Sequence, residues 1–145
     1  QYERKGDELI HKTKIKVRFY ECDVYGHVNH AVYLNYLECA RIDFLNTNNL
    51  SMKAFQDMGY RLFIAQININ FKNSAEHDDL LIIKTTPLEL GKSYGIFRQT
   101  VLKENIKICE AEVKWVCVND KGKPSRLPDL PGISVLNPGM ESANR

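Results

Sequence analysis

The chain has 145 residues, 43% of them hydrophobic and 26% charged, which is typical of a globular protein with a sizeable core. Its 20 basic and 18 acidic residues give a net charge of +2, too balanced to indicate a nucleic-acid partner. No apolar run approaches the roughly 18 residues of a membrane span, and residues 1–10 lack the apolar segment of a secretory signal.

The four cysteines are scattered along the chain and form no CxxC pair. Their even number permits disulfides, but a chain of this length builds a core without them. We therefore expect reduced thiols in a cytoplasmic protein at Cys22, Cys39, Cys109 and Cys117.

The first predicted elements are a strand and a long helix. Residues 12–20 alternate between polar and apolar side chains, which is the period of a half-buried strand. Residues 31–45 are apolar at nearly every helical offset, and Asn29 or His30 marks the start of this helix. A helix this apolar needs another element to cover it. Its polar stripe consists of Asn35, Glu38 and Arg41.

A short helix and four strands are expected to follow. Ser51 is the expected N-cap of the short helix, over residues 51–59, and Gly59 its C-terminal stop. Pro87 favours an edge position or a bulge in the second of the four strands. In the strand expected at residues 62–72, alternation places five apolar side chains on one face: Phe63, Ala65, Ile67, Ile69 and Phe71. The strands are expected at residues 62–72, 79–90, 93–103 and 106–118.

These elements predict an α+β fold. An antiparallel sheet with one apolar face needs a cover, and the long helix needs a sheet around it. The economical arrangement is a five-stranded antiparallel sheet wrapped around one long central helix. The segment from Asn119 onward is rich in Gly, Pro, Asp and Asn and is expected to be a flexible tail.

Asp23 is the candidate catalytic residue. It follows the first strand and stands seven residues before His30, near the predicted helix start. Backbone N–H groups at a helix start have no partners within the helix, and the helix dipole is positive there. A carboxylate beside such donors can attack a carbonyl, or activate a water, while the donors hold the oxyanion. The commoner role of an aspartate at this place is to stabilise the helix dipole or an Asx-turn, and from the residues alone both roles stay open.

Two other chemistries for this segment are weaker. Cys22 is a possible nucleophile, but adjacent side chains of a strand point to opposite faces, so Cys22 and Asp23 do not readily address one substrate. His27 and His30, with Asp23 or Glu21, offer a possible metal site. Two histidines three apart are common by chance, and no further ligand pattern follows, so we expect no metal.

A longer pattern surrounds Asp23. It comprises Tyr20, Glu21, Cys22, Asp23, Gly26, Val28, Asn29, His30, Tyr33, Leu34, Tyr36, Leu37, Glu38, Ala40 and Arg41, with later matches at residues 74–79, 91–93 and 118–128. The pattern resembles hotdog-fold thioesterases of the 4-hydroxybenzoyl-CoA thioesterase type. It is also similar to the acyl-CoA thioesterases linked to the Tol–Pal system. The resemblance covers about residues 12–130 and implies a single hotdog domain for residues 1–145.

The resemblance also implies roles for individual residues. Asp23 matches the catalytic aspartate of these families, as nucleophile or general base on the thioester carbonyl. Asn29 and His30 stand where a backbone N–H polarises that carbonyl. Tyr33 and Glu38 fall where the helix lines an acyl pocket, often that of a neighbouring subunit. The regions that meet the coenzyme A phosphates contain Lys92 and Arg126.

The function implied is hydrolysis of an acyl-CoA thioester by a homodimer or homotetramer that needs no bound cofactor. Three alternatives remain: a thioesterase for acyl carrier protein, a non-catalytic acyl-CoA sensor, and a hotdog hydratase. The sensor lacks the carboxylate that Asp23 supplies, and the hydratase motifs HFPGHP and Asp-x-Asn-Pro-x-His are absent. One departure is His27, where many relatives have an apolar residue, and it adds a titrating group near the carboxylate.

Overall fold

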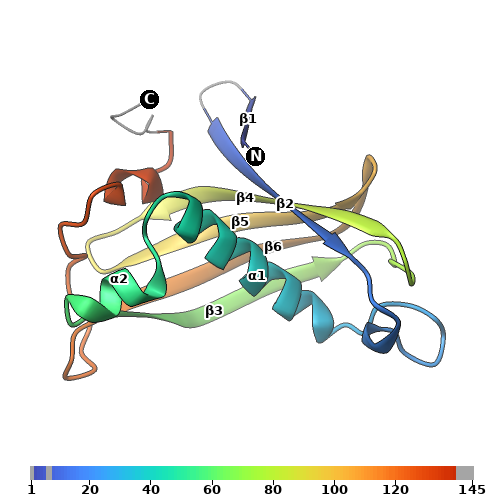
Figure 1. Ribbon diagram of the computed structural model, residues 1–145, viewed down its shortest axis with the longest axis horizontal. Coiled ribbons are helices and arrows are strands. Elements are labelled where there is room, and N and C mark those ends of the chain that lie inside the picture. The colour runs from blue at the N-terminus through green and yellow to red at the C-terminus, as the bar shows by residue number, and fades with distance from the viewer. Residues whose placement is uncertain (1, 6–7, 140–145) are drawn as a thin grey trace.

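One antiparallel sheet and one long helix organise the molecule (Figure 1). The computed structural model describes residues 2–5 and 8–139. The helices are α1 (Val32–Thr47) and α2 (Met52–Asp57), with short 3₁₀ helices at Phe19–Glu21 and Ile133–Leu136. The strands are β1 (Tyr2–Lys5), β2 (Glu8–Lys16), β3 (Arg61–Phe71), β4 (Leu80–Leu90), β5 (Tyr94–Lys103) and β6 (Ile106–Val118).

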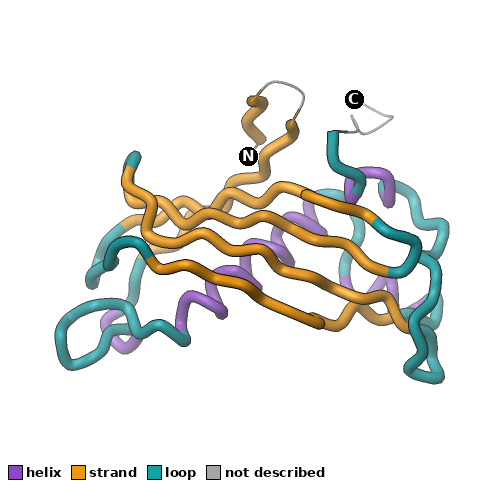
Figure 2. Tube along the Cα trace, turned by 180° about the vertical axis from the view of Figure 1, so that it is seen from behind, coloured by secondary structure: helices purple, strands orange, loops and turns teal. Residues whose placement is uncertain are grey.

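The predicted α+β architecture is confirmed. The strand order is β1-β2-β4-β5-β6-β3, and α1 crosses one face of the sheet, while Figure 2 shows the opposite face without a helix in front of it. The five expected strands are present, and the short β1 adds a sixth beside β2. The first expected strand lies earlier than predicted because the chain turns into a 3₁₀ helix at Phe19, where the Glu21 carboxylate accepts the N–H of Arg18 at 2.7 Å.

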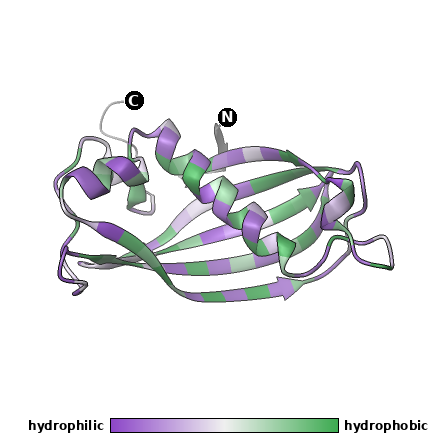
Figure 3. Ribbon diagram, turned by 60° about the horizontal axis from the view of Figure 1, so that its bottom comes forward, coloured by the Kyte–Doolittle hydropathy of each residue, from purple (hydrophilic) through white to green (hydrophobic). Residues whose placement is uncertain are grey.

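The buried face of α1 packs on the sheet. Hydropathy alternates along the strands below it, as Figure 3 shows, so each strand presents its apolar side to the helix. Asn35 and Glu38 are exposed as expected, but the predicted polar stripe is wrong at Arg41, which is only 7% exposed. Arg41 is buried because the amide of Gln99 on β5 accepts its Nη1–H at 3.0 Å. The helix buries Tyr33, Tyr36, Leu37, Ala40, Arg41, Phe44 and Leu45.

The strand β3 contains a bulge that alternation does not reveal. Its pairing with β6 shifts between Ile64 and Gln66. Leu62 and Ile64 therefore pair with Cys117 and Trp115, whose side chains face the helix, and Phe63 points the other way. The prediction that Phe63 shares the face of Ile67 is wrong, because one extra residue in a strand reverses the phase of alternation.

Pro87 lies at a bulge, as predicted. The pairing of β4 with β5 shifts between Pro87 and Glu89. β4 is an interior strand between β2 and β5, but its pairing with β2 ends at Thr85. Pro87 therefore stands where no neighbour on that side requires its missing N–H.

The segment after β6 is packed against the core up to Leu136. Val135 and Leu136 are buried in the same apolar cluster as Phe44 and Leu50. The expectation of a flexible tail is therefore wrong for this part, because apolar side chains recur within its Gly- and Pro-rich sequence. They are Leu127, Leu130, Ile133, Val135 and Leu136. The last part of the expected tail, residues 140–145, lies outside the described residues.

A glycine on β5 allows the indole of Trp115 to lie flat on the sheet. A Cβ added at Gly95 would stand 2.3 Å from Cζ2 and 2.5 Å from Cε2 of Trp115. Trp115 is buried, and Gly95 is paired with it across the β5–β6 ladder. The absence of a side chain at Gly95 is therefore a packing requirement.

Candidate active site

The loop between β2 and α1 holds Asp23 at one end of the sheet (Figure 1). Cys22 and Val28 form an isolated bridge that closes the loop, and the N–H of Asp23 donates to the carbonyl of His27 at 2.8 Å. Gly26 has a φ of +78°, which favours glycine, so the tight return of the chain depends on this residue.

The two oxygens of the Asp23 carboxylate have different surroundings. Oδ1 accepts the N–H groups of Tyr25 at 2.9 Å and His27 at 3.2 Å, which is an Asx-turn. Among the described residues, nothing donates to Oδ2. The side chain is exposed. Both roles anticipated for this residue are thus open to it at once, since one oxygen stabilises the turn and the other is free to react.

The start of α1 lies next to this loop. The carbonyl of Glu21 accepts the N–H of Asn29 at 2.9 Å, so that N–H is engaged in the fold. The side-chain oxygen of Asn29 accepts the N–H of Ala31 at 3.0 Å and caps the turn that leads into Val32. The N–H of His30 has no acceptor among the described residues. Of the two candidate oxyanion donors, His30 is therefore the one that remains available.

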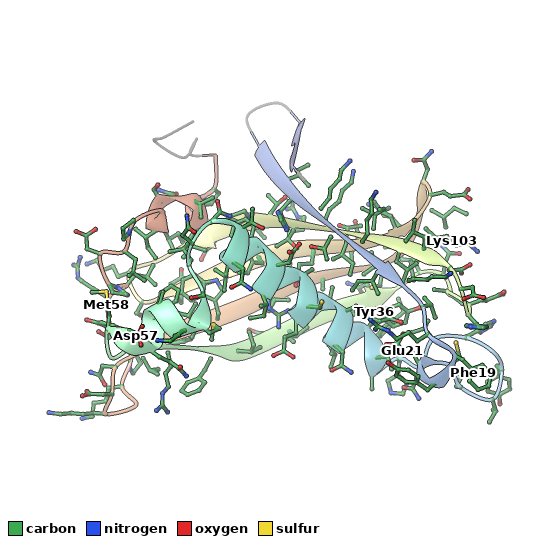
Figure 4. All side chains as sticks on the ribbon, in the orientation of Figure 1. Phe19, Glu21, Tyr36, Asp57, Met58 and Lys103 are labelled. Atoms are coloured by element: carbon green, nitrogen blue, oxygen red, sulfur yellow. The ribbon has the colours of Figure 1, made fainter. Side chains whose placement is uncertain are left out.

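Beneath the loop, a buried carboxylate and a tyrosine form a contact that the sequence did not reveal. Tyr36 on α1 donates its hydroxyl to Glu21 at 2.8 Å, and the two side chains lie together in Figure 4. Burial and this hydrogen bond raise the pKa of Tyr36. Glu21 also contacts Arg18, which leaves it poorly placed as a metal ligand. The only signal for this pair was the position of Glu21 two residues before Asp23 in the motif.

A groove of about 510 Å³ runs beside this pair between β2 and α1. Lys14, Lys16 and Arg18 line its β2 side, and Asn35, Tyr36 and Cys39 line its helix side. The buried Glu21 carboxylate lines it too, and exposed charges of both signs stand at its opening, since Asp78 lies 3.7 Å from Lys16.

The two predicted pocket residues of α1 lie in different places. Tyr33 is 3% exposed, and its hydroxyl accepts the N–H of Ala75 at 3.3 Å in the core. Burial raises the pKa of Tyr33 to about 12. Glu38 is exposed and lines a slot that also contains Arg41. No ion pair joins Glu38 to Arg41 within 4 Å in the described part of the chain.

Lys92 and Arg126 stand far from Asp23 within one chain. Lys92 is in the turn that follows β4, and Arg126 follows the return of the chain past Cys117, whose carbonyl accepts the N–H of Ser125. Asp23 is at the other end of β4, which has 11 residues and therefore a length of roughly 35 Å. One protomer does not bring these cations to the carboxylate.

The turn at residues 75–79 supports the Asp23 loop. The carbonyl of Ala75 accepts the N–H of Val28 at 2.8 Å. Asp79 fixes this turn, since its Oδ2 accepts the N–H of Glu76 at 2.8 Å and its Oδ1 lies 3.0 Å from Nζ of Lys103. Burial raises the pKa of Asp79, but these two partners outweigh it, and the net pKa lies below the ordinary value of 3.8.

We expect Asp79→Asn to lower the free energy of unfolding by about 1 kcal/mol at neutral pH. Because the folded state has the lower pKa, ionised Asp79 stabilises the fold at pH values above 3.8. That contribution disappears as the pH falls through the folded-state pKa. Urea unfolding of both proteins at pH 7 and pH 3 measures the difference, and a gap that is equal at both values contradicts the assignment.

The geometry supports neither Cys22 as a nucleophile nor a metal site in this segment. Burial, followed by the charges of Asp23 and Glu21, raises the pKa of Cys22, which reduces its thiolate fraction at neutral pH. No group of three His, Cys, Asp or Glu side chains suited to a metal occurs among residues 2–5 and 8–139. Within the same residues, no helix is long and apolar enough to span a membrane.

The chain is similar to known proteins in both sequence and fold. The family model described as the thioesterase-like superfamily matches residues 17–134. The long-chain acyl-CoA thioesterase FadM of Escherichia coli is 38% identical over 112 residues, which are 76% of this chain and 84% of that protein. The chloroplastic acyl-acyl carrier protein thioesterase ATL3 of Arabidopsis thaliana is 30% identical over 129 residues, covering 86% of this chain and 66% of that protein.

A solved structure agrees with these matches. The crystal structure of a probable thioesterase from Bartonella henselae superposes with a TM-score of 0.77 at 31% identity. The match covers 82% of this chain and 99% of that one. These matches show that the chain is a thioester hydrolase of the hotdog fold and belongs to the thioesterase-like superfamily.

Proposed function

We propose that this protein hydrolyses acyl-CoA thioesters and that Asp23 performs the chemistry. The observation that carries the proposal is the unengaged Oδ2 of Asp23 beside the helix start, where the N–H of His30 has no acceptor among the described residues. The likeness to the acyl-CoA thioesterase FadM supports coenzyme A as the carrier.

Two routes use the same groups. In the first, Oδ2 attacks the thioester carbonyl carbon, coenzyme A thiolate leaves, and water then hydrolyses the acyl-aspartyl anhydride. In the second, Asp23 takes a proton from a water that attacks the carbonyl directly. In both, the oxyanion accepts a hydrogen bond from the N–H of His30 near the positive end of α1. The products are the free acid and coenzyme A.

Thiol release from acetyl-, hexanoyl-, dodecanoyl-, palmitoyl- and benzoyl-CoA tests the activity. Hydrolysis of at least one of these thioesters is expected. Release from none of them, together with tight binding of one, would contradict the proposal and favour an acyl-CoA sensor. A single turnover in ¹⁸O-labelled water that places label in Asp23 identifies the anhydride route, because direct attack of water on the thioester leaves Asp23 unlabelled.

Acyl carrier protein thioesters are the second candidate substrate. The likeness to the acyl-acyl carrier protein thioesterase ATL3 is the observation that favours them. The two substrate classes are distinguished by measuring kcat/KM for the same acyl chain attached to coenzyme A and to acyl carrier protein. The preferred carrier gives the higher value.

The open edge of β3 supports a homodimer. In the described part of the chain, β3 ends the sheet and pairs only with β6, and its exposed side chains include Phe63, Ile64 and Phe71. Such an edge pairs readily with a second copy across a two-fold axis. Antiparallel pairing of two β3 edges would bring the Lys92 and Arg126 end of one protomer beside the Asp23 end of the other. We therefore propose that these two cations bind the phosphates of a coenzyme A held at the partner's carboxylate.

We expect a dimer or tetramer by light scattering. A lysine in place of Phe63, an exposed residue of this edge strand, is expected to weaken the assembly and the activity together, because its charge opposes burial against a second copy. A monomeric wild-type protein with full activity would contradict a shared site.

A cytoplasmic location is proposed with this function, and cell fractionation tests it.

A further inference from the structure

A slot between α1, α2 and β3 combines apolar walls with a buried cation. The cation is Arg41, and the exposed carboxylate of Glu38 lies at the rim. Its volume of about 70 Å³ suits the end of a ligand rather than a whole substrate. The apolar walls are Ile42, Leu45, Met52, Leu62, Ile64, Phe97 and Trp115.

Arg41 is held in place with most of its donors unused. Nη1 donates to Oε1 of Gln99 at 3.0 Å. The amide of Gln99 is itself fixed, because Nε2 donates to the carbonyl of Leu37 and to the hydroxyl of Thr85, each at 3.0 Å. Among the described residues, the Arg41 side chain has no second acceptor and no carboxylate within 4 Å.

Arg41 is only 7% exposed as a residue, but its remaining guanidinium N–H groups are not among the fully buried unpartnered atoms of the described residues, so they still reach water. Burial lowers the pKa of Arg41, and the charge of Glu38 opposes this only in part. A purely alkyl ligand in the slot would remove water from the remaining N–H groups without replacing its hydrogen bonds. A ligand with an oxygen at its end would supply the missing acceptor.

One face of α1 connects the slot to the candidate catalytic centre. Leu34, Glu38 and Ile42 follow each other at four-residue spacing, so they lie in one row along the helix. Leu34 is exposed on this face. From His30 to Arg41 the chain advances 11 residues, which is about 16 Å along the helix axis. An acyl chain that follows this row therefore reaches Arg41 with its far end.

We propose that the slot binds the distal end of the acyl group and that Arg41 selects acyl chains whose distal end carries an oxygen, such as a hydroxyl. This inference rests on the proposed thioesterase function, because it makes the slot part of that substrate site. It assigns to Arg41 a specificity role and leaves the chemistry to Asp23. A site with a fixed donor discriminates strongly against the ligand that lacks the acceptor.

The test compares three thioesters: dodecanoyl-CoA, ω-hydroxydodecanoyl-CoA and β-hydroxydodecanoyl-CoA. We expect kcat/KM to be at least about tenfold higher for the ω-hydroxy chain than for the other two. In Arg41→Met, the ω-hydroxy preference is expected to disappear, with the kcat/KM for ω-hydroxydodecanoyl-CoA falling to that for dodecanoyl-CoA. The matched control is Arg98→Met, an exposed arginine on β5 that lies outside the slot.

A second variant keeps the test valid if Arg41→Met does not fold. Met52 is a half-buried residue of α2 that lines the slot away from the edge of β3, and Met52→Trp fills the slot without altering Arg41. We expect this variant to lose the ω-hydroxy preference and to hydrolyse dodecanoyl-CoA less well than hexanoyl-CoA. An ω-hydroxy preference that survives in either folded variant overturns the inference.

The failure of this inference is distinguishable from failure of the proposed function. Wild-type hydrolysis of dodecanoyl-CoA without an ω-hydroxy preference, or with a β-hydroxy preference, overturns only the role of Arg41. If no thioester is hydrolysed, calorimetry with the thioethers S-dodecyl-CoA and S-(ω-hydroxydodecyl)-CoA still applies. Tighter binding of the hydroxylated thioether to wild type, lost in Arg41→Met, supports the slot, and equal binding overturns it.

Discussion

Asp23→Asn is expected to reduce kcat for thioester hydrolysis by about 10²–10⁴-fold, the effect of removing a catalytic base or nucleophile. The amide replaces the reactive Oδ2 with an NH₂ group, which neither attacks a carbonyl nor accepts a proton. The remaining Oδ1 still accepts the N–H groups of Tyr25 and His27, so the Asx-turn is retained. Thiol-release kinetics and thermal unfolding of the two proteins measure the two effects separately.

The matched control is Asp57→Asn. Asp57 is an exposed aspartate at the end of α2, labelled at the opposite end of the molecule in Figure 4, and it pairs with Lys53 at 2.9 Å. We expect this variant to hydrolyse thioesters at the wild-type rate. An Asp23→Asn protein that keeps its fold and its turnover would remove Asp23 from the mechanism.

Gly95→Ala is expected to lower the free energy of unfolding by about 1–3 kcal/mol, the usual effect of overpacking a core. The added methyl group would stand within 3 Å of three atoms of the Trp115 indole, which is buried and has little room to move. The backbone of Gly95 does not have a positive φ, so the cost comes from the contact alone. Urea unfolding of the variant gives the free energy directly.

A double-mutant cycle isolates this contact. Trp115→Leu removes the ring atoms that the methyl group would meet, so Gly95→Ala is expected to cost much less in that background. An equal cost in both backgrounds would show that the glycine is required for another reason.

Hydrophobic period was sufficient to predict the sheet and the central helix. The face of Cys109, Ala111, Val113, Trp115 and Cys117 on β6 is buried throughout. Hydrophobic periodicity did not predict which face the side chains before the β3 bulge occupy. One inserted residue reverses the alternation there without changing the composition of the strand. It also failed at Arg41, because the partner that buries this cation, Gln99, lies 58 residues away in the sequence.

The candidate site was predicted in part. The family pattern pointed to Asp23 and His30, which the fold places at the two ends of one loop. Sequence could not reveal that the N–H of Asn29 is engaged by Glu21, since this depends on how the loop folds back. Nor could it show that Lys92 and Arg126 lie a full strand length from Asp23, because that separation depends on which end of the sheet each loop occupies.

The packing of Val135 and Leu136 has a consequence for the order in which the molecule is completed during synthesis. These side chains close the apolar cluster around Phe44 and Leu50, yet they are made about ninety residues after them. A nascent chain therefore exposes this end of the core until the segment with Val135 and Leu136 has left the ribosome. The Asp23 loop rests on the turn at residues 75–79, which is tied to Lys103 on β5, so the chemical end can form before the segment that seals the core is made.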